Sequence, residues 1–208
     1  MAVKDIFKRN NPFNEMLTRV FNLLELNLLW IVFSLPIITL GASAAALYAL
    51  CFQMLENRET SIFKEYVKVF KNNFRPSLPY TLTLLAGGVV LLADLHILGA
   101  GEGGSSGILY GCCLVLLAAL AAVFSYAIPL FSRYENSFVG TMNNAWRLAA
   151  TQIPQTLALL AIHGLPWILL LKAPGIFFHV FWIWIFAGRA VGAYLCAMIL
   201  RPVFEKLK

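Results

Sequence analysis

The chain has 208 residues, of which 60% are hydrophobic and 12% charged, and its mean hydropathy is +0.77. A soluble domain carries about 25% charged residues, so the composition argues against an ordinary soluble protein. The net charge of +6 does not indicate nucleic acid binding, because the basic residues flank apolar stretches, where they suit anionic lipid headgroups.

Fourteen of the sixteen Lys and Arg residues fall in four short patches, separated by apolar stretches long enough to cross a bilayer. The patches contain Lys4, Lys8, Arg9 and Arg19; Arg58, Lys64, Lys68, Lys71 and Arg75; Arg133 and Arg147; and Arg201, Lys206 and Lys208. The positive-inside rule places all four patches, and with them both termini, in the cytoplasm. An even number of crossings must then separate neighbouring patches.

The apolar stretches divide into six candidate transmembrane helices, each near the roughly 20 residues that a bilayer core requires. They lie near residues 20–36, 41–55, 77–98, 108–131, 153–171 and 176–199. Residues 20–55 must hold two crossings, and Pro36 and Gly41 provide a break between them. A tilted or re-entrant pair is the alternative there, and five spans also fit the pattern. The fold class is therefore an all-α, polytopic membrane bundle in one domain, residues 1–208.

Ala42-Ser43-Ala44 follows an apolar run and imitates a signal-peptide cleavage site. Cleavage there would leave residues 45–55 too short to cross, and it would strand the second basic patch outside. An uncleaved chain is therefore expected.

Two amphipathic segments, near residues 60–74 and 136–150, are predicted to lie at the cytoplasmic interface. In the first segment four aromatic residues recur at helical spacing opposite a basic face: Phe63, Tyr66, Phe70 and Phe74. One interpretation is a lipid-facing connector. The other is a docking helix for a cytoplasmic or membrane partner.

The sequence contains a candidate internal repeat. A shift of 75 positions superimposes Arg58 on Arg133, Phe63 on Phe138, Pro79 on Pro154 and Thr81 on Thr156. The repeated order is a span, an interfacial helix and a span that begins with proline, twice in the same orientation. Parallel repeats of this kind occur in membrane transport folds.

Three motifs carry a resemblance to a known family. They are Asn11-Pro-Phe13, Ser34-Leu-Pro-Ile-Ile-Thr-Leu-Gly-Ala-Ser43 with Ala46-Leu-Tyr48, and Phe70-Lys-Asn-Asn-Phe-Arg75. With them the chain resembles the bacterial YesL family over nearly its whole length. The resemblance implies a small multi-pass protein of the bacterial cell membrane, of undefined activity, encoded near carbohydrate ABC importers and sensor kinases. It supplies no catalytic residues.

Arg189 is the outstanding polar residue of the predicted spans, because it lies about midway along the last one. An arginine at the centre of a membrane helix costs about 2.5 to 3.5 kcal/mol on insertion scales, so it should face the bundle and have a partner. Glu25 in the first span is the candidate partner. The pair is interpreted either as a structural contact that sets helix register or as a contact to a substrate or partner. Gly188 and Gly192, in Gly-x-x-x-Gly spacing, favour close helix packing.

His163 is predicted near the midplane of the fifth span, and Asp94 and His96 near the outer end of the third. They could relay protons, although a structural role is favoured because no partner stands at metal-ligand or nucleophile spacing. Asn22 and Asn27 are candidates for hydrogen bonds between helices. The four cysteines form no C-x-x-C pair, so neither a metal nor a cofactor is expected.

No catalytic motif is present, and we expect no enzyme activity. The leading hypothesis is an accessory or scaffold subunit for carbohydrate uptake, bound to an ABC permease or its sensor kinase. The alternative is a small transporter or channel that works as an oligomer. A homo-oligomer is compatible with either.

Overall fold

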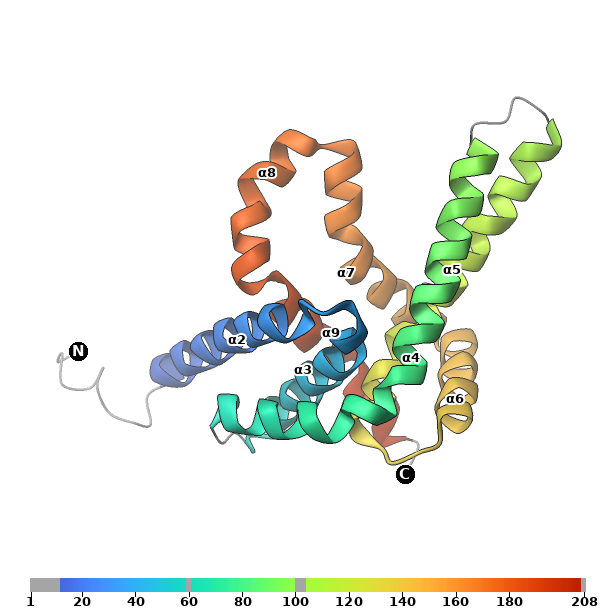
Figure 1. The fold of residues 1–208 in the computed structure, drawn as a ribbon. Coiled ribbons are helices and arrows are strands. Elements are labelled where there is room, and N and C mark those ends of the chain that lie inside the picture. Colours follow the sequence, from blue (N-terminus) through green and yellow to red (C-terminus); the bar gives the residue numbers. More distant parts are fainter. Residues whose placement is uncertain (1–11, 59–60, 100–103, 207–208) are drawn as a thin grey trace.

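The computed structural model describes residues 12–58, 61–99 and 104–206 (Figure 1). Within these ranges the chain is helical, with short connections and no strand. The basic residues Lys4, Lys8, Arg9 and Lys208 lie outside the described residues, as does the middle of the glycine-rich connection near residues 99–107. The predicted all-α membrane fold is confirmed.

The predicted pair of spans within residues 20–55 is present as two separate helices, α2 (Pro12–Ser34) and α3 (Leu40–Leu55). A short 3-10 helix, η1 (Ile37–Thr39), joins them, with Pro36 as its N-cap. Pro36 ends α2, because proline disfavours the helical conformation in the residue before it. Gly41 does not lie in this bend. It belongs to the first turn of α3, where it packs against the next helix.

Helix α3 is the centre of the molecule and packs against α2, α4, α5 and α9. Every residue from Gly41 to Tyr48 is buried, because a run of small residues lets neighbouring helices approach closely. The helix ends where Asn57 adopts the left-handed conformation, with φ of 52°. The Arg58 amide then donates to the Gln53 carbonyl oxygen at 3.0 Å, as in a Schellman cap.

The predicted interfacial segment 60–74 and the predicted span 77–98 form one helix, α4 (Ile62–Gly99), with Pro76 and Pro79 inside it. Figure 1 shows that the first part of α4 lies across the base of the molecule and that the helix then turns upward. The two prolines bend this helix without ending it. Ser77 and Thr81 donate hydroxyl hydrogen bonds to carbonyl oxygens one turn earlier, which also favours bending.

The second half of the chain begins with α5 (Gly104–Arg133), α6 (Phe138–Thr151) and α7 (Ile153–Lys172). The predicted interfacial helix 136–150 is therefore present as α6, which Ser137 caps by accepting a hydrogen bond from the Gly140 amide. Helices α6 and α7 meet at an angle of 103°. The order of α3 and α4 thus recurs in α5, α6 and α7. In the first unit the amphipathic segment and the following span form one bent helix, α4, whereas in the second unit they form two helices, α6 and α7.

Equivalent threonines support the predicted repeat. Thr81 Oγ1 accepts a hydrogen bond from the Gly41 amide of α3 at 3.1 Å. Thr156 Oγ1 lies 3.0 Å from the Tyr126 hydroxyl of α5. In each unit a buried threonine near the start of the proline-containing span thus joins it to the helix before the amphipathic segment.

The predicted sixth span, residues 176–199, is not a single helix. The structure has α8 (Pro174–Ile183), a π-helical turn η2 (Trp184–Gly188) and α9 (Arg189–Glu205). Helices α7 and α8 form a hairpin that diverges from the α4–α5 hairpin in Figure 1. The π-helical turn interrupts the predicted span because a side chain from α2 enters its backbone, as described below.

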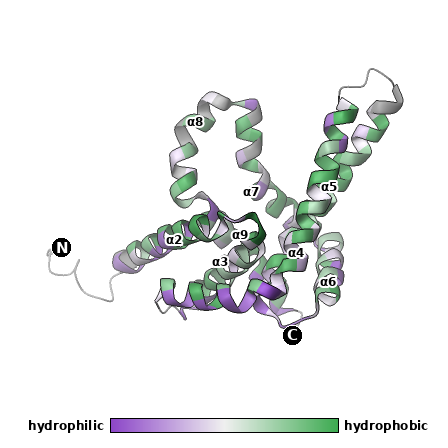
Figure 2. Ribbon diagram, in the orientation of Figure 1, coloured by the Kyte–Doolittle hydropathy of each residue, from purple (hydrophilic) through white to green (hydrophobic). Residues whose placement is uncertain are grey.

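Five helical segments of the described chain are long and apolar enough to cross a membrane. They are Asn14–Ser34, Ile37–Leu55, Ile62–Gly99, Gly107–Arg133 and Trp184–Glu205, and the bent pair of α6 and α7 would make a sixth. Figure 2 shows apolar residues along these helices and hydrophilic residues gathered at the N-terminal end of α2, at the start of α4 and near the C-terminus.

Candidate functional site

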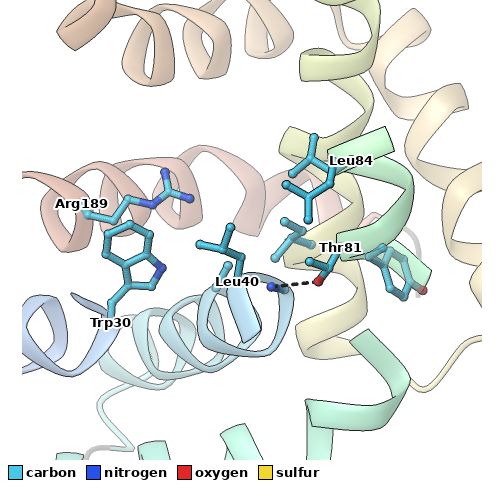
Figure 3. Close-up of a pocket in the computed structure, with 10 residues that line it drawn as sticks. Trp30, Leu40, Thr81, Leu84 and Arg189 are labelled. Atoms are coloured by element: carbon cyan, nitrogen blue, oxygen red, sulfur yellow. Dashed lines mark hydrogen bonds between the residues drawn. The ribbon is translucent and has the colours of Figure 1, made fainter. Parts of the chain in front are cut away.

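Arg189 is the first residue of α9 and follows the π-helical turn directly. Its guanidinium carbon lies 5.3 Å from the centroid of the Trp30 ring of α2 (Figure 3). The Arg189 Nε atom is buried and has no hydrogen-bond partner. Within the segment Trp184–Glu205, Arg189 lies near one end, so the expected position at mid-span is wrong. The π-helical turn displaces it, because the helix does not continue straight back to residue 176.

Glu25 does not form the predicted ion pair with Arg189. Its side chain is exposed, and none of the ion pairs among the described residues includes either residue. The face of α2 that meets α9 instead carries Leu26, Asn27 and Trp30. One residue of rotation on a helix is about 100°, which explains why Glu25 points away.

Two cavities meet at Arg189. The smaller, of about 110 Å³, lies between α2, α3, α4, α5 and α9, and Figure 3 shows Arg189 and Trp30 on one side of it and Thr81 and Leu84 on the other. The larger, of about 250 Å³, has eight lining residues: Trp30, Ile162, His163, Pro166, Trp184, Gly188, Arg189 and Gly192. Trp30 and Arg189 line both, so the stacked pair separates them.

His163 lines the larger cavity and is hydrogen-bonded through both ring nitrogens. Its Nδ1 lies 2.8 Å from the Leu159 carbonyl oxygen, and its Nε2 lies 3.3 Å from the Tyr48 hydroxyl. A carbonyl oxygen only accepts, so Nδ1 carries a proton and donates to Leu159, whereas the Tyr48 hydroxyl beside Nε2 can either donate or accept. Both ring nitrogens are thus occupied within the protein.

Asn27 explains the π-helical turn. Its side-chain nitrogen donates to the Ile185 carbonyl oxygen at 2.5 Å, and its side-chain oxygen accepts from the Ala190 amide at 2.9 Å. These two backbone groups are five positions apart, as the two partners of a π-helical hydrogen bond are. The buried Asn27 carboxamide therefore replaces that bond. The predicted role of Asn27 in bridging helices is confirmed. No feature of the sequence indicates that its side chain bonds to the backbone of a π-helical turn.

Asp94 and His96 lie near the far end of α4, away from Arg189 and His163. His96 is exposed, Asp94 is half-buried, and neither side chain has a hydrogen bond or ion pair to another described residue. Within the described ranges no group of three or more His, Cys, Asp and Glu side chains is arranged to hold a metal ion. The structure thus does not assemble the predicted polar residues into one relay.

The aromatic face of the predicted docking helix packs largely against the chain itself. Tyr66 is fully buried, and its hydroxyl lies 2.7 Å from Ser43 Oγ and 3.1 Å from the Ser43 carbonyl oxygen. Phe70 packs against Phe33 with ring centroids 4.8 Å apart, and Phe74 contacts Phe70. Phe63 is the exposed member of the set, at 54%. A partner could therefore reach Phe63 and the basic side of this helix.

Four arginines, one from each predicted basic patch, converge on the C-terminal end of α3. Arg19 donates to Asn57 Oδ1 at 2.8 Å, Arg133 to Glu56 Oε1 at 2.9 Å, Arg201 to the Leu55 carbonyl oxygen at 3.1 Å, and Arg58 pairs with Glu56 Oε2. The end of a helix carries partial negative charge, which favours this arrangement. One arginine of each patch thus lies at the same end of α3, and the side of the membrane that the patches face stays a prediction. Glu56 is not among the candidate residues predicted from the sequence, although it is an acidic residue close to the second basic patch.

A polar groove of about 650 Å³ opens beside this cluster, between α3, the first part of α4 and the segment that follows α5. Its lining includes the side chains of Gln53, Asn72, Asn73, Arg133 and Asn136. Asn73 donates to the Val69 carbonyl oxygen, whereas the carboxamides of Gln53, Asn72 and Asn136 make no hydrogen bond within the described chain. Arg133 Nη1 is buried without an acceptor.

Taken together, these features define an integral, multi-pass helical membrane protein with a polar groove at its basic end and a cationic cavity among its helices. The family described as "Protein of unknown function, DUF624" matches residues 23–95. The chain is also 25% identical over 195 residues to "Uncharacterized protein YesL" of Bacillus subtilis (strain 168), which covers 92% of this chain and 89% of the relative. The resemblance to the YesL family is thus confirmed. No solved structure matches the chain significantly.

Proposed function

We propose that this protein is a non-enzymatic accessory subunit of the bacterial cell membrane that docks a second membrane protein at its basic end. The observation that supports this most is the polar groove beside the arginine cluster. Carboxamides both donate and accept hydrogen bonds, so Gln53, Asn72 and Asn136 suit the backbone of a partner polypeptide better than a simple ion. The exposed basic side of α4, with Lys64, Lys68 and Lys71, borders the same end.

The partner that we propose is the permease of a carbohydrate ABC importer or the sensor kinase that controls it. This choice rests on the resemblance to the YesL family. The groove lies at the end where the basic patches meet, so the contact would be made by a cytoplasmic segment of the partner.

Affinity purification of the full chain in mild detergent, from the bacterium that encodes it, tests the proposal. The unsubstituted chain should co-isolate one permease or kinase in a fixed ratio. Asn72→Trp fills the groove and should reduce that ratio at least about tenfold, whereas Asn144→Trp, at an exposed asparagine of α6 outside the groove, should leave it unchanged. Recovery of homo-oligomers alone, or equal recovery with both variants, would refute the docking role.

We also propose that both termini and the groove face the cytoplasm, as the positive-inside rule requires. Single cysteines at Lys64 and Asn136 should then resist a membrane-impermeant maleimide in intact cells, and a cysteine at the exposed Lys172 of the α7–α8 turn should react. The unsubstituted chain, with its own cysteines, sets the background. The opposite labelling pattern would show that the groove and the termini face the outside of the cell.

A second candidate function is a small transporter or channel acting as an oligomer. The cavity of about 250 Å³ among the helices, with Arg189 and His163 in its lining, favours it. Purified protein in proteoliposomes should then carry a solute flux that Arg189→Ala abolishes. A flux that survives this substitution would eliminate the proposed pathway.

A further inference from the structure

The guanidinium of Arg189 lies among apolar helices without a counter-ion from the described chain. Glu25 is exposed, Asp94 lies near the far end of α4, and no acidic side chain lines either cavity. A cation held in this way is costly unless an anion joins it. The Nε atom of Arg189 is buried without a partner, and the two terminal nitrogens make no hydrogen bond within the described chain, so these terminal nitrogens are the donors that an anion in the cavity would take.

The contact with Trp30 leaves the guanidinium free to bind. The guanidinium carbon lies over the Trp30 ring, 5.3 Å from the ring centroid. The N–H groups of arginine point outward from the edges of that plane, and two of them match the two oxygens of a carboxylate. The contact with Trp30 therefore holds the guanidinium at the cavity, and the terminal N–H groups make no hydrogen bond within the described chain.

The lining and the volume of the larger cavity indicate the size and polarity of the rest of the ligand. Its lining is mostly apolar and includes Trp30, Trp184, Ile162 and Pro166. Its volume of about 250 Å³ lies just below the range of about 300 to 1,000 Å³ that is usual for ligand pockets. His163 offers no free ring nitrogen to an anion, because the Leu159 carbonyl and the Tyr48 hydroxyl already occupy both of them. A small ligand with one anionic end and an apolar body fits this lining.

We propose that this cavity binds a small carboxylate with an apolar body, held by the Arg189 guanidinium with its body against Trp30 and Trp184. The proposal does not depend on the accessory role, which concerns the groove at the other end of α3. Asn27 positions the site, because its hydrogen bonds to Ile185 and Ala190 hold the turn from which Arg189 projects.

The full chain in lipid nanodiscs provides the test, with 3-phenylpropanoate as the probe and 3-phenylpropan-1-ol as its neutral counterpart. The acid should raise the unfolding temperature in a saturable way, and the alcohol at the same concentrations should not. Arg189→Gln should weaken the apparent affinity at least about tenfold, the loss expected for a hydrogen bond to a charged group.

A second variant keeps the test valid if Arg189→Gln does not fold. Gly192 lines the cavity, and a Cβ added there meets only Ile162 at an ordinary 3.5 Å. Gly192→Leu should therefore keep the charge, fill the cavity and abolish probe binding. Equal binding of acid and alcohol, binding unchanged by Gly192→Leu, or an equal effect of inorganic phosphate would overturn the proposal. So would a wild-type chain that ignores the probe while Arg189→Gln loses a co-purified membrane protein, because the carboxylate would then belong to a partner.

Discussion

Gly41 lies at a tight contact between α3 and α4. A Cβ atom at this position would lie 2.3 Å from Thr81 Oγ1 and 3.1 Å from the Ser77 carbonyl oxygen. The Gly41 amide also donates to Thr81 Oγ1. The glycine in this motif is therefore needed for a close contact between helices, which it permits because it has no side chain.

Gly41→Ala is expected to destabilise the protein by about 1 to 3 kcal/mol, the usual cost of overpacking a tight contact. Thermal or denaturant unfolding in detergent measures the change. Gly88→Ala in α4 is the matched control, because a Cβ there meets nothing within 4 Å and alanine favours a helix. Equal stability of the two variants would contradict the packing role of Gly41.

Asn27 is the residue that completes the backbone of the π-helical turn. Asn27→Leu would leave the Ile185 carbonyl and the Ala190 amide without the partners that they have now. Each buried group left unpaired costs about 1 to 3 kcal/mol, so a loss of several kcal/mol in unfolding free energy is expected.

Asn27→Asp tests the two hydrogen bonds individually. An ionised carboxylate still accepts from the Ala190 amide but no longer donates to Ile185, so it does not restore wild-type stability. Asn144→Leu, at an exposed position of α6, controls for the change from amide to leucine. Unfolding curves in detergent compare the variants, and a neutral effect of Asn27→Leu would show that the turn forms without it.

Residues with unusual chemistry could be predicted from the sequence, but their partners could not. Arg189 stands out because a cation in an apolar stretch is costly wherever the helix lies. Trp30 and Glu25 are five positions apart on α2, and only the crossing of α2 with α9 decides which of them meets Arg189. That crossing is a tertiary property, which side-chain polarity alone does not determine.

At the scale of elements, proline and glycine act differently according to their neighbours. Pro36 ends a helix, whereas Pro76 and Pro79 only bend one. The sequence predicts an interruption at each place, but continuation of α4 depends on its packing against α3 and α5. The break between α8 and α9 has no proline, so it could not be predicted from local signals.

Gly188 belongs to this break and Gly192 to the helix after it. A Cβ on Gly188 would lie 2.5 Å from Trp184 Cδ1, whereas one on Gly192 would meet Ile162 at 3.5 Å. Gly188→Ala should therefore lower stability by about 1 to 3 kcal/mol, and Gly192→Ala should be close to neutral. Both substitutions gain the same helix propensity, so the difference between their unfolding midpoints isolates the Trp184 contact. A reversed order would place the close packing at Gly192.

For the whole molecule, Glu56 joins the two halves of the predicted repeat. Arg58 and Arg133 occupy equivalent positions and share this one carboxylate. The Arg133 and Glu56 side chains are only 16% and 17% exposed. The sidedness of the basic patches stays a prediction that depends only on counting crossings, and the meeting of one arginine from each patch at the end of α3 agrees with it. The central place of α3 could not be predicted, because small apolar residues look alike whether they face lipid or protein.

Glu56→Gln should cost about 1 to 3 kcal/mol of stability, because it leaves the largely buried Arg133 without its carboxylate. Glu205→Gln removes the exposed partner of Arg201 and should change stability by less than about 1 kcal/mol. Unfolding of both variants at low and high salt makes the comparison. Similar losses in both variants would show that the arginine cluster contributes no more than an ordinary surface pair.

The contact of Asn27 with Ala190 spans 163 positions of the chain. During synthesis α2 is inserted long before α9 has been made, so the Asn27 carboxamide must remain without its partners while the intervening helices enter the bilayer. The two hydrogen bonds that Asn27 makes to the π-helical turn and α9 form only when these elements pack onto α2, so a nascent chain that stops short of residue 190 presents an unpaired carboxamide on the face of α2 that carries Leu26 and Trp30.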